Sequence, residues 1–275
     1  MLPISDAGRR YGSRPVVTLV LIGLNSLVFL YEITIGGFGF LFGGGGLQSF
    51  VFFLQFGFIP AELSSGRAFE LLPVGASAIS IASPIPTWGT IFTSMFIHGS
   101  LMHFIGNMLF LWVFGDNIEA AFGHLKYLLF YLVAGVLATL SHYAIDPSSQ
   151  TPLVGASGAI SGVMGAYLIL YPRNRIRTLI IYFLITVIEL RAVWLLVIWF
   201  VLQAIQGLLS IGVSHEVSTA FFAHIGGFVV GAIVGLAVRP FRRRPGGMSR
   251  SGGGRGRRDD YDQRPPQYWR GRRID

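Results

Sequence analysis

The chain has 275 residues, of which 52% are hydrophobic and only 12% are charged. Soluble globular chains carry about 25% charged residues, so this composition indicates a membrane protein. The absence of cysteine excludes disulfides, thiolate metal sites and cysteine nucleophiles. Residues 239–275 hold 12 Arg and 4 Asp, which accounts for the whole net charge of +8. A basic nucleic-acid-binding domain is therefore not expected.

The apolar runs predict an all-α polytopic membrane protein with six transmembrane helices, because about 20 apolar residues cross a ~30 Å hydrocarbon core. The expected spans are residues 15–34, 100–119, 123–144, 154–171, 192–211 and 219–238. The first run is too long for a cleaved signal peptide, so we expect it to be retained. A further run at 178–190 is short and ends in charged residues. We expect it to be re-entrant or interfacial and not a seventh span.

Basic residues precede the first span and follow the second, fourth and sixth spans. By the positive-inside rule, this pattern places both termini in the cytoplasm. Residues 1–14 are then a cytoplasmic segment, and residues 15–238 form the membrane domain with a large outer loop at 35–99. Within this loop, four apolar side chains at helical spacing could lie in the plane of the membrane interface. They are Phe50, Phe53, Leu54 and Phe58.

Residues 239–275 are too rich in Arg, Gly and Pro to bury a core, so we expect a disordered cytoplasmic tail. We expect the tail to contact anionic lipid, with RNA contact by its Arg-Gly stretch as the alternative. No nucleic-acid partner is expected for the protein as a whole. The short cytoplasmic start and the arginine-rich ends fit a multi-pass protein of a prokaryotic plasma membrane.

Four polar side chains lie inside the expected spans, where their desolvation is costly and each is a functional candidate. His103 and Asn107 lie in span two, Ser157 in span four and His224 in span six. At a rise of ~1.5 Å per residue, the two histidines and the serine stand at one depth, ~6–10 Å below the outer boundary. Three unrelated structural residues would rarely share one depth, so the sequence predicts one site.

Small residues predict that spans four and six meet, since such faces let helix backbones approach closely. Gly155 and Gly158 flank the serine, and Gly227 and Gly231 follow the histidine. Ser157 could then hydrogen-bond to His224, and an imidazole is the usual base that activates a serine.

The backbone N–H of Ser157, the Asn107 amide and the His103 ring are candidate donors to an oxyanion. His103 and Asn107 are i and i+4, so both side chains can point at one spot.

Alternative explanations exist for each residue taken alone. A serine in a Gly/Ala-rich helix is usually a packing residue, and a lone Asn is usually an interhelical hydrogen-bond partner. A Gly-x-Ser-x-Gly elbow is excluded, because it needs a strand before the serine. Zinc is poorly supported, since His98 and His103 are five residues apart with no acidic ligand at their depth. No metal or other cofactor is expected.

Three stretches carry a resemblance to the rhomboid intramembrane serine proteases: FTSMFIHGSLMHFIGNMLFLWVFGDNIEAAFG (92–123), GASGAISG (155–162) and AHIGGFVVG (223–231). The resemblance implies that Ser157 is the nucleophile and His224 the general base. It implies that His103 and Asn107 serve the oxyanion. His98 matches a second family histidine, which is structural or substrate-facing. Glu119 with Gly123 matches a helix-end contact.

Two positions depart from the family pattern. The Trp-Arg pair of many first loops is Trp88-Gly89 here. Many rhomboids carry Tyr or Phe four residues after the serine, under the histidine ring, whereas this chain has Ser161.

We therefore expect an intramembrane serine endopeptidase that cleaves transmembrane segments of membrane-protein substrates near the outer face, through an acyl-enzyme. The first alternative is a catalytically inactive rhomboid-like protein that binds transmembrane helices. The second is a transporter or channel in which His103, Asn107 and His224 line a polar path. The expected partners are transmembrane substrates and the bilayer.

Overall fold

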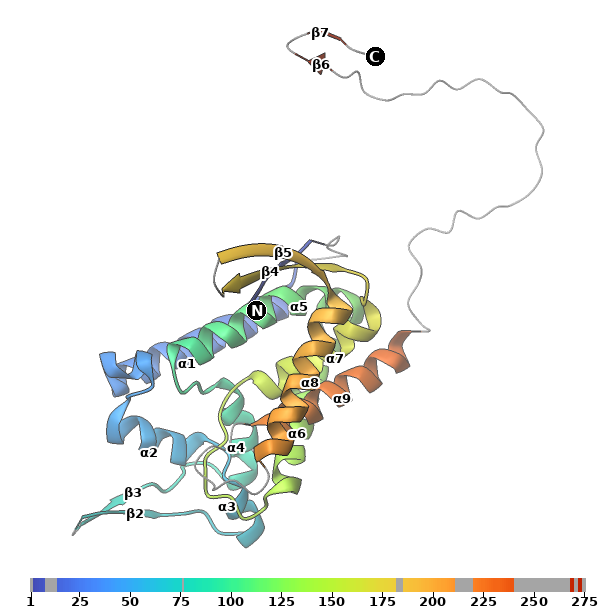
Figure 1. The fold of residues 1–275 in the computed structure, drawn as a ribbon. Helices are drawn as coiled ribbons and strands as arrows, with labels where there is room; N and C mark the ends of the chain where they lie inside the picture. The colour runs from blue at the N-terminus through green and yellow to red at the C-terminus, as the bar shows by residue number, and fades with distance from the viewer. Residues whose placement is uncertain are drawn as a thin grey trace. The chain divides into compact units, whose positions relative to one another are not determined.

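The computed structural model describes residues 2–7, 14–75, 77–181, 185–210, 220–239, 268–269 and 272–273. Residues 2–239 form a helical bundle with a three-stranded sheet across one end (Figure 1). The chain is mostly helical, and this sheet is the part of the fold that the expected all-α architecture lacks. Strands β6 (Tyr268–Trp269) and β7 (Arg272–Arg273) pair in a separate unit. Apart from these strands and Arg239, the expected disordered tail lies outside the described residues.

Four described helices are long and apolar enough to cross a membrane. They are α1 (Val16–Gly36), α6 (His124–Ile145), α8 (Ala192–Ser210) and α9 (Phe221–Val238). A fifth span is counted if α4 (Thr87–Thr93) with η2 (Ser94–Phe96) joins α5 (Leu101–Phe122) across a bend of 82°. Helix α7 (Ser157–Leu170) has only 14 residues, or ~21 Å. The fourth expected span, which contains α7, therefore stays a prediction.

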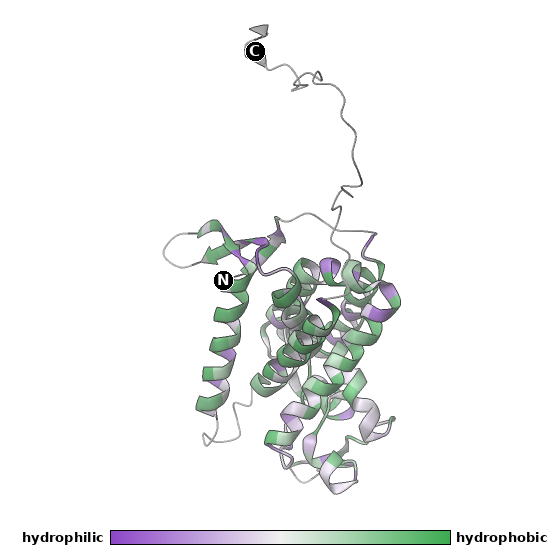
Figure 2. Ribbon diagram, turned by 90° about the vertical axis from the view of Figure 1, so that its right-hand side faces the viewer, coloured by the Kyte–Doolittle hydropathy of each residue, from purple (hydrophilic) through white to green (hydrophobic). Residues whose placement is uncertain are grey.

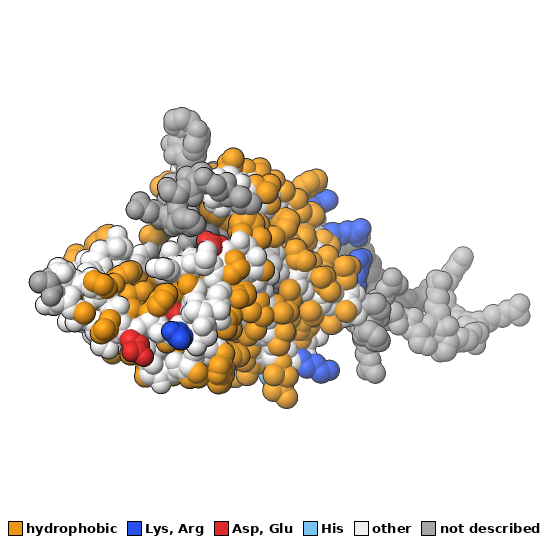
Figure 3. Space-filling model, turned by 90° about the horizontal axis from the view of Figure 1, so that it is seen from below, with side chains coloured by type: hydrophobic (Ala, Val, Ile, Leu, Met, Phe, Trp, Pro, Cys, Tyr) orange, Lys and Arg blue, Asp and Glu red, His pale blue; other side chains and the backbone are white. Residues whose placement is uncertain are grey.

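The surface of the bundle is largely apolar, as a bilayer requires of a multi-pass protein. Hydrophobic residues run along the helices (Figure 2), and a view from below shows few charged side chains among the hydrophobic ones (Figure 3). Large apolar side chains on α1, α6 and α8 are exposed, including Leu27, Leu125 and Leu208. In water such surfaces would be costly, whereas lipid tails accommodate them.

Helices α7 and α9 pack so closely that only glycine fits between them. A methyl group added to Gly227 would overlap the carbonyl oxygen of Gly158. One turn further along, a methyl group on Gly231 would overlap the carbonyl oxygen of Gly162. The close approach expected from the small-residue faces is therefore found in the structure.

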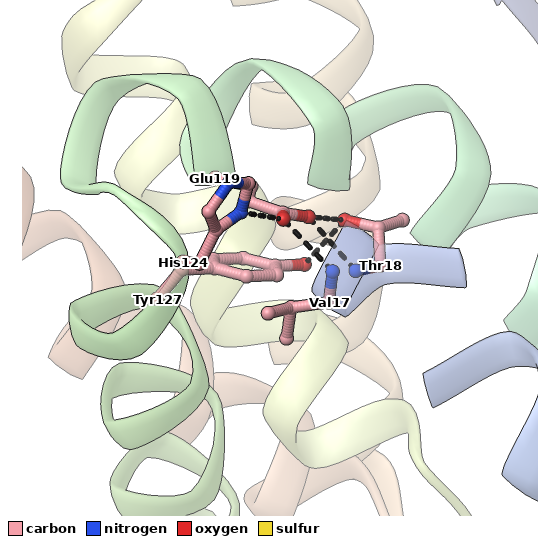
Figure 4. A network of polar contacts seen from close by, with 5 residues as sticks. All are labelled: Val17, Thr18, Glu119, His124 and Tyr127. Atoms are coloured by element: carbon pink, nitrogen blue, oxygen red, sulfur yellow. Dashed lines mark hydrogen bonds and ion pairs between the residues drawn. The ribbon is translucent and has the colours of Figure 1, made fainter. Parts of the chain in front are cut away.

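A buried carboxylate joins α1, α5 and α6 at the end of the bundle where α1 begins (Figure 4). Glu119 is 1% exposed and accepts the backbone N–H groups of Val17 and Thr18, both at 2.8 Å. It also accepts the Thr18 hydroxyl at 2.7 Å and lies 2.6 Å from Nδ1 of His124. Negative charge at a helix N-terminus satisfies unpaired amides and complements the helix dipole. The helix-end contact is therefore held by four hydrogen bonds.

The sheet at this end has the order β1-β4-β5, with antiparallel neighbours. Its strands are β1 (Leu2–Asp6), β4 (Arg175–Ile181) and β5 (Ile185–Arg191). The apolar run at 178–190 therefore belongs to the β4–β5 hairpin and is not a seventh spanning helix. Asp6 anchors β1 by accepting hydrogen bonds from Asn117 at 2.8 Å, from Asn174 at 3.1 Å and from the Tyr167 hydroxyl.

The loop at 35–99, which the sequence predicts on the outer side, contains η1 (Phe38–Phe42), α2 (Gly46–Phe56), α3 (Pro60–Ser65), β2 (Leu71–Val74) and β3 (Ser77–Ser80). The four side chains expected in the interface plane do not lie together there. Phe50 is exposed and Phe53 is half-buried, but Leu54 and Phe58 are buried in the protein. Leu54 packs with Ile81, the residue after β3, because the loop folds back on α2 and covers this face of the helix.

Candidate active site

A cavity of about 210 Å³ lies between α5, α7, α8 and α9. It contains all four polar side chains predicted from the expected spans, namely His103, Asn107, Ser157 and His224. Its remaining lining residues are Met102, Gly106, Phe110, Ile160, Ser161, Met164, Trp199 and Gln203. Three expected spans that are far apart in sequence therefore meet at one cavity, as their common depth predicts.

Ser157 and His224 are within hydrogen-bonding distance. Ser157 is the first residue of α7, and His224 lies in the first turn of α9. The Ser157 Oγ lies 2.7 Å from the His224 Nε2, although the two residues are 67 positions apart. The contact of Gly158 with Gly227 is adjacent to both side chains and holds the two helix ends together. A serine bonded to an imidazole has the geometry of an activated nucleophile.

The other ring nitrogen of His224 has a partner that sequence reasoning missed. The side-chain oxygen of Gln203, on α8, lies 2.6 Å from the His224 Nδ1. An amide oxygen only accepts, so the Nδ1 carries the proton and the Nε2 is free to accept one from Ser157. The orientation of the Gln203 amide and the tautomer of His224 are thus both assigned from these two hydrogen bonds.

An aromatic ring also packs against His224. The ring centroid of Trp199 lies 5.9 Å from that of His224, and Trp199 is one turn before Gln203 on α8. Ser161, in the position of the aromatic residue of many rhomboids, donates its hydroxyl to the Ser157 carbonyl at 2.7 Å. The ring support thus comes from α8 and not from α7. A polar Gln inside an apolar span was the available signal.

His103 and Asn107 lie across the cavity on α5. The His103 Nδ1 accepts the backbone N–H of Gly99 at 3.4 Å, which leaves the ring proton on the Nε2. Gly155 has a φ of +128°, and a Cβ there would lie 2.9 Å from the His103 Nε2. A glycine is therefore needed for the imidazole to approach the loop before Ser157. Asn107 donates to the His103 carbonyl at 3.1 Å and has a second amide hydrogen for the cavity.

The similarity to known proteins agrees with this geometry. The Rhomboid domain matches residues 86–241, more than half of the chain. The chain belongs to the rhomboid family. It is 30% identical over 200 residues to the rhomboid protease AarA of Providencia stuartii, a match that covers 68% of each chain. It is 32% identical over 131 residues to the rhomboid protease GluP of Bacillus subtilis, covering 47% of this chain and 24% of GluP.

A plant relative, RHOMBOID-like protein 5 of Arabidopsis thaliana, is 30% identical over 148 residues. That match covers 53% of this chain and 43% of the relative. The chain thus spans less than half the length of GluP and of the plant protein. At the family level this rhomboid is a multi-pass membrane protein related to intramembrane proteases.

The other predicted residues lie outside the cavity of this rhomboid. His98 is fully buried, and its ring packs edge-on against Phe104 and lies 5.2 Å from the ring of His103. Of its two expected roles, this position fits the structural one. Glu119 lies 16 residues after His103 on α5, roughly 24 Å away along the helix.

Glu32 is a buried acid inside α1 that sequence reasoning also missed. Its carboxylate accepts the backbone N–H of His98 at 3.0 Å and 3.3 Å. The bond joins α1 to the segment that leads into α5 and therefore helps to hold the start of α5, where His103 lies. An acidic residue within an apolar span was the signal for it.

Proposed function

We propose that this rhomboid is an intramembrane serine endopeptidase that cleaves transmembrane segments of membrane-protein substrates near the outer membrane face. The observation that carries the proposal is the 2.7 Å distance between the Ser157 Oγ and the His224 Nε2 beside a cavity. The protease names of AarA and GluP support it at the family level.

In the proposed reaction, the Ser157 Oγ attacks the carbonyl carbon of the scissile bond while the His224 Nε2 takes its proton. Collapse of the tetrahedral intermediate breaks the C–N bond, and His224 returns the proton to the leaving amine. Water then hydrolyses the acyl-enzyme with His224 again as the base. Gln203 acts as a positioning residue, because its oxygen holds the Nδ1 proton and so directs the Nε2 at Ser157.

Three donors could stabilise the oxyanion. The backbone N–H of Ser157 is at the start of α7, where helix amides have no intrahelical partner. The His103 Nε2 and the second amide hydrogen of Asn107 face the same cavity. Preorganised donors of this kind typically contribute roughly 10²–10³-fold each in an oxyanion hole.

We also propose six spans, with α7 as the fourth. If Ser157 lies ~6–10 Å below the outer boundary, a helix of ~21 Å ends near the inner boundary of a ~30 Å core. A short helix suffices because the loop before Ser157 takes the place of the outer end of α7 and admits water to the serine. We further propose that both termini are cytoplasmic and that the 239–275 tail contacts anionic lipid. The membrane is then a prokaryotic plasma membrane.

Fluorophosphonate labelling of detergent-purified protein tests the activity without knowledge of the substrate. We expect the wild type to be labelled, and Ser157→Ala and His224→Ala to lose the label while keeping the helical circular dichroism of the wild type. Ser141→Ala is the matched control, because this serine is on α6 and bonds to its own helix. It should label like the wild type. Equal labelling of Ser157→Ala would refute the assignment of the nucleophile.

The catalytically inactive alternative predicts a different result. A folded wild type that takes no label but still binds transmembrane peptides would favour the helix-binding protein. Cleavage of a reconstituted transmembrane peptide by the wild type, absent in both dyad variants, would exclude it. A transporter or channel would retain its flux in Ser157→Ala.

A further inference from the structure

The β4–β5 hairpin joins the ends of two membrane helices. Helix α7 ends at Leu170, five residues before β4 begins at Arg175, and α8 begins at Ala192, directly after β5. The backbone N–H of Ala192 donates to the carbonyl of Asn174 at 2.8 Å, which closes the base of the hairpin. The base is therefore held at the end of the bundle where α7 ends and α8 begins (Figure 1). Ser157 is at the opposite end of α7.

The hairpin extends beyond the part of the bundle that covers it. On the face toward the bundle, Ile176 and Thr178 near the base are 0% exposed. Thr186 is on the same face near the tip, where it pairs with Ile180, and it is exposed. Seven residues per strand span roughly 23 Å, so the tip projects past the helices beneath the base.

The opposite face changes from charged to apolar along the hairpin. At the base, Arg175 pairs with Arg191 in the strand register, and Arg177 pairs with Glu189. The Glu189 carboxylate lies 3.3 Å from the Arg177 Nε. Toward the tip on this face, the described side chains are apolar; Leu179 is half-buried, whereas Ile185 is 77% and Val187 52% exposed.

This change from charged to apolar side chains indicates whether water or lipid surrounds the tip. A sheet face in water stays polar along its length, as the base of this hairpin does. An apolar strand end open on both faces would invite aggregation in water, whereas the interfacial layer of a bilayer accepts it. The tip cannot be far from that layer, because its base is attached to two membrane helices. Arginines at the base match anionic headgroups.

We propose that the far end of the β4–β5 hairpin, at Ile185 and Val187, inserts into the interfacial layer of the phospholipid leaflet at the inner ends of α7 and α8. The arginines at its base contact anionic headgroups, and Ile185 and Val187 lie among the upper acyl chains. The hairpin thus anchors the connection between the helix of Ser157 and the helix of Gln203. This placement depends on the membrane helices and not on the proposed protease activity.

Single-cysteine labelling tests this anchor, because the chain contains no cysteine of its own. Val187→Cys would carry an environment-sensitive NBD fluorophore in single-copy nanodiscs of phosphatidylglycerol and phosphatidylcholine. We expect blue-shifted emission, quenching by lipids brominated near the headgroup and protection from aqueous iodide. Leu137→Cys, within spanning helix α6, is the lipid-exposed control, and the exposed loop residue Gln150→Cys is the aqueous control.

Two results would overturn the anchor. One is a Val187 probe quenched by iodide as strongly as the Gln150 probe. The other is protection that appears only in nanodiscs holding two copies, because a second chain would then cover the tip. With pure phosphatidylcholine, we expect iodide access at Val187 to rise, since the arginines lose their anionic partners. The Gln150 probe should not change.

Discussion

Substitution of Gly231 by alanine tests whether the close packing of α7 and α9 sets the geometry of the site. Gly231 lies seven residues, or about two turns, after His224 on α9. The added methyl group would overlap the carbonyl oxygen of Gly162 on α7, which is part of a rigid helix backbone and cannot turn aside. The new Cβ would lie 1.8 Å from that oxygen, so an ordinary contact of about 3.5 Å requires the two helices to separate locally by roughly 1.7 Å.

Such a separation is larger than the tolerance of the hydrogen bond it affects. The Ser157 Oγ and the His224 Nε2 are 2.7 Å apart, and the bond weakens beyond about 3.2 Å. A misplacement of about 1 Å costs roughly 10²-fold in rate, or about 2.7 kcal/mol. We therefore expect Gly231→Ala to be labelled by a fluorophosphonate roughly 100 times more slowly than the wild type.

The assay compares labelling rates and thermal unfolding midpoints across a graded series. In Gly23→Ala, on α1, the new methyl group has no neighbour within 4 Å, so this control should match the wild type. In Gly235→Ala, the methyl group would lie 3.0 Å from the Ile169 Cβ, so a small loss is expected. If Gly231→Ala labels within twofold of Gly23→Ala with an unchanged midpoint, helix separation does not control the site.

Two further substitutions test side chains whose partners only the tertiary contacts revealed. Gln203→Leu should lower kcat about tenfold and leave KM unchanged, because one hydrogen bond of about 0.5–1.5 kcal/mol to His224 is lost. Gln203→Glu, whose carboxylate still accepts a hydrogen bond from His224, should retain more activity than Gln203→Leu. The control Gln206→Leu, at an exposed position on the same helix, should have no effect. A change in KM alone would contradict the positioning role of Gln203. Glu119→Gln should destabilise the fold by about 1–3 kcal/mol, because it leaves buried donors unpaired. The exposed Glu70→Gln should leave the unfolding midpoint unchanged in the same thermal assay, and equal midpoints for both variants would refute the importance of this contact.

The candidate residues Ser157, His224, His103 and Asn107 were predictable because lipid makes polar side chains conspicuous. A polar side chain in a span is costly to desolvate and is therefore a functional candidate. The constant rise of the helix per residue converts its sequence position into an expected depth. The glycines were predictable for a related reason, since small residues repeated along a span mark a close helix contact. These rules need only the local sequence, and the structure brings all four side chains to one cavity.

The hairpin at 175–191 illustrates a local ambiguity. A short apolar run suits a buried strand, an interfacial segment or part of a helix, and periodicity does not separate them. Its β-branched residues, such as Ile180 and Val187, favour a strand. The pairing with β1, from the other end of the chain, decided the outcome, because it adds a third strand to a hairpin that is marginal alone.

The sequence by itself determined the membrane class, the polar residues that line one cavity and the helix faces that can approach each other. Only the tertiary structure decided that α8 supplies Gln203 and Trp199 to His224, and that Glu32 supports the segment before α5. The physical reason is that a membrane helix is apolar all round. Its composition therefore does not reveal which side faces lipid and which faces a neighbour, and the rotation of each helix is set by its packing partners.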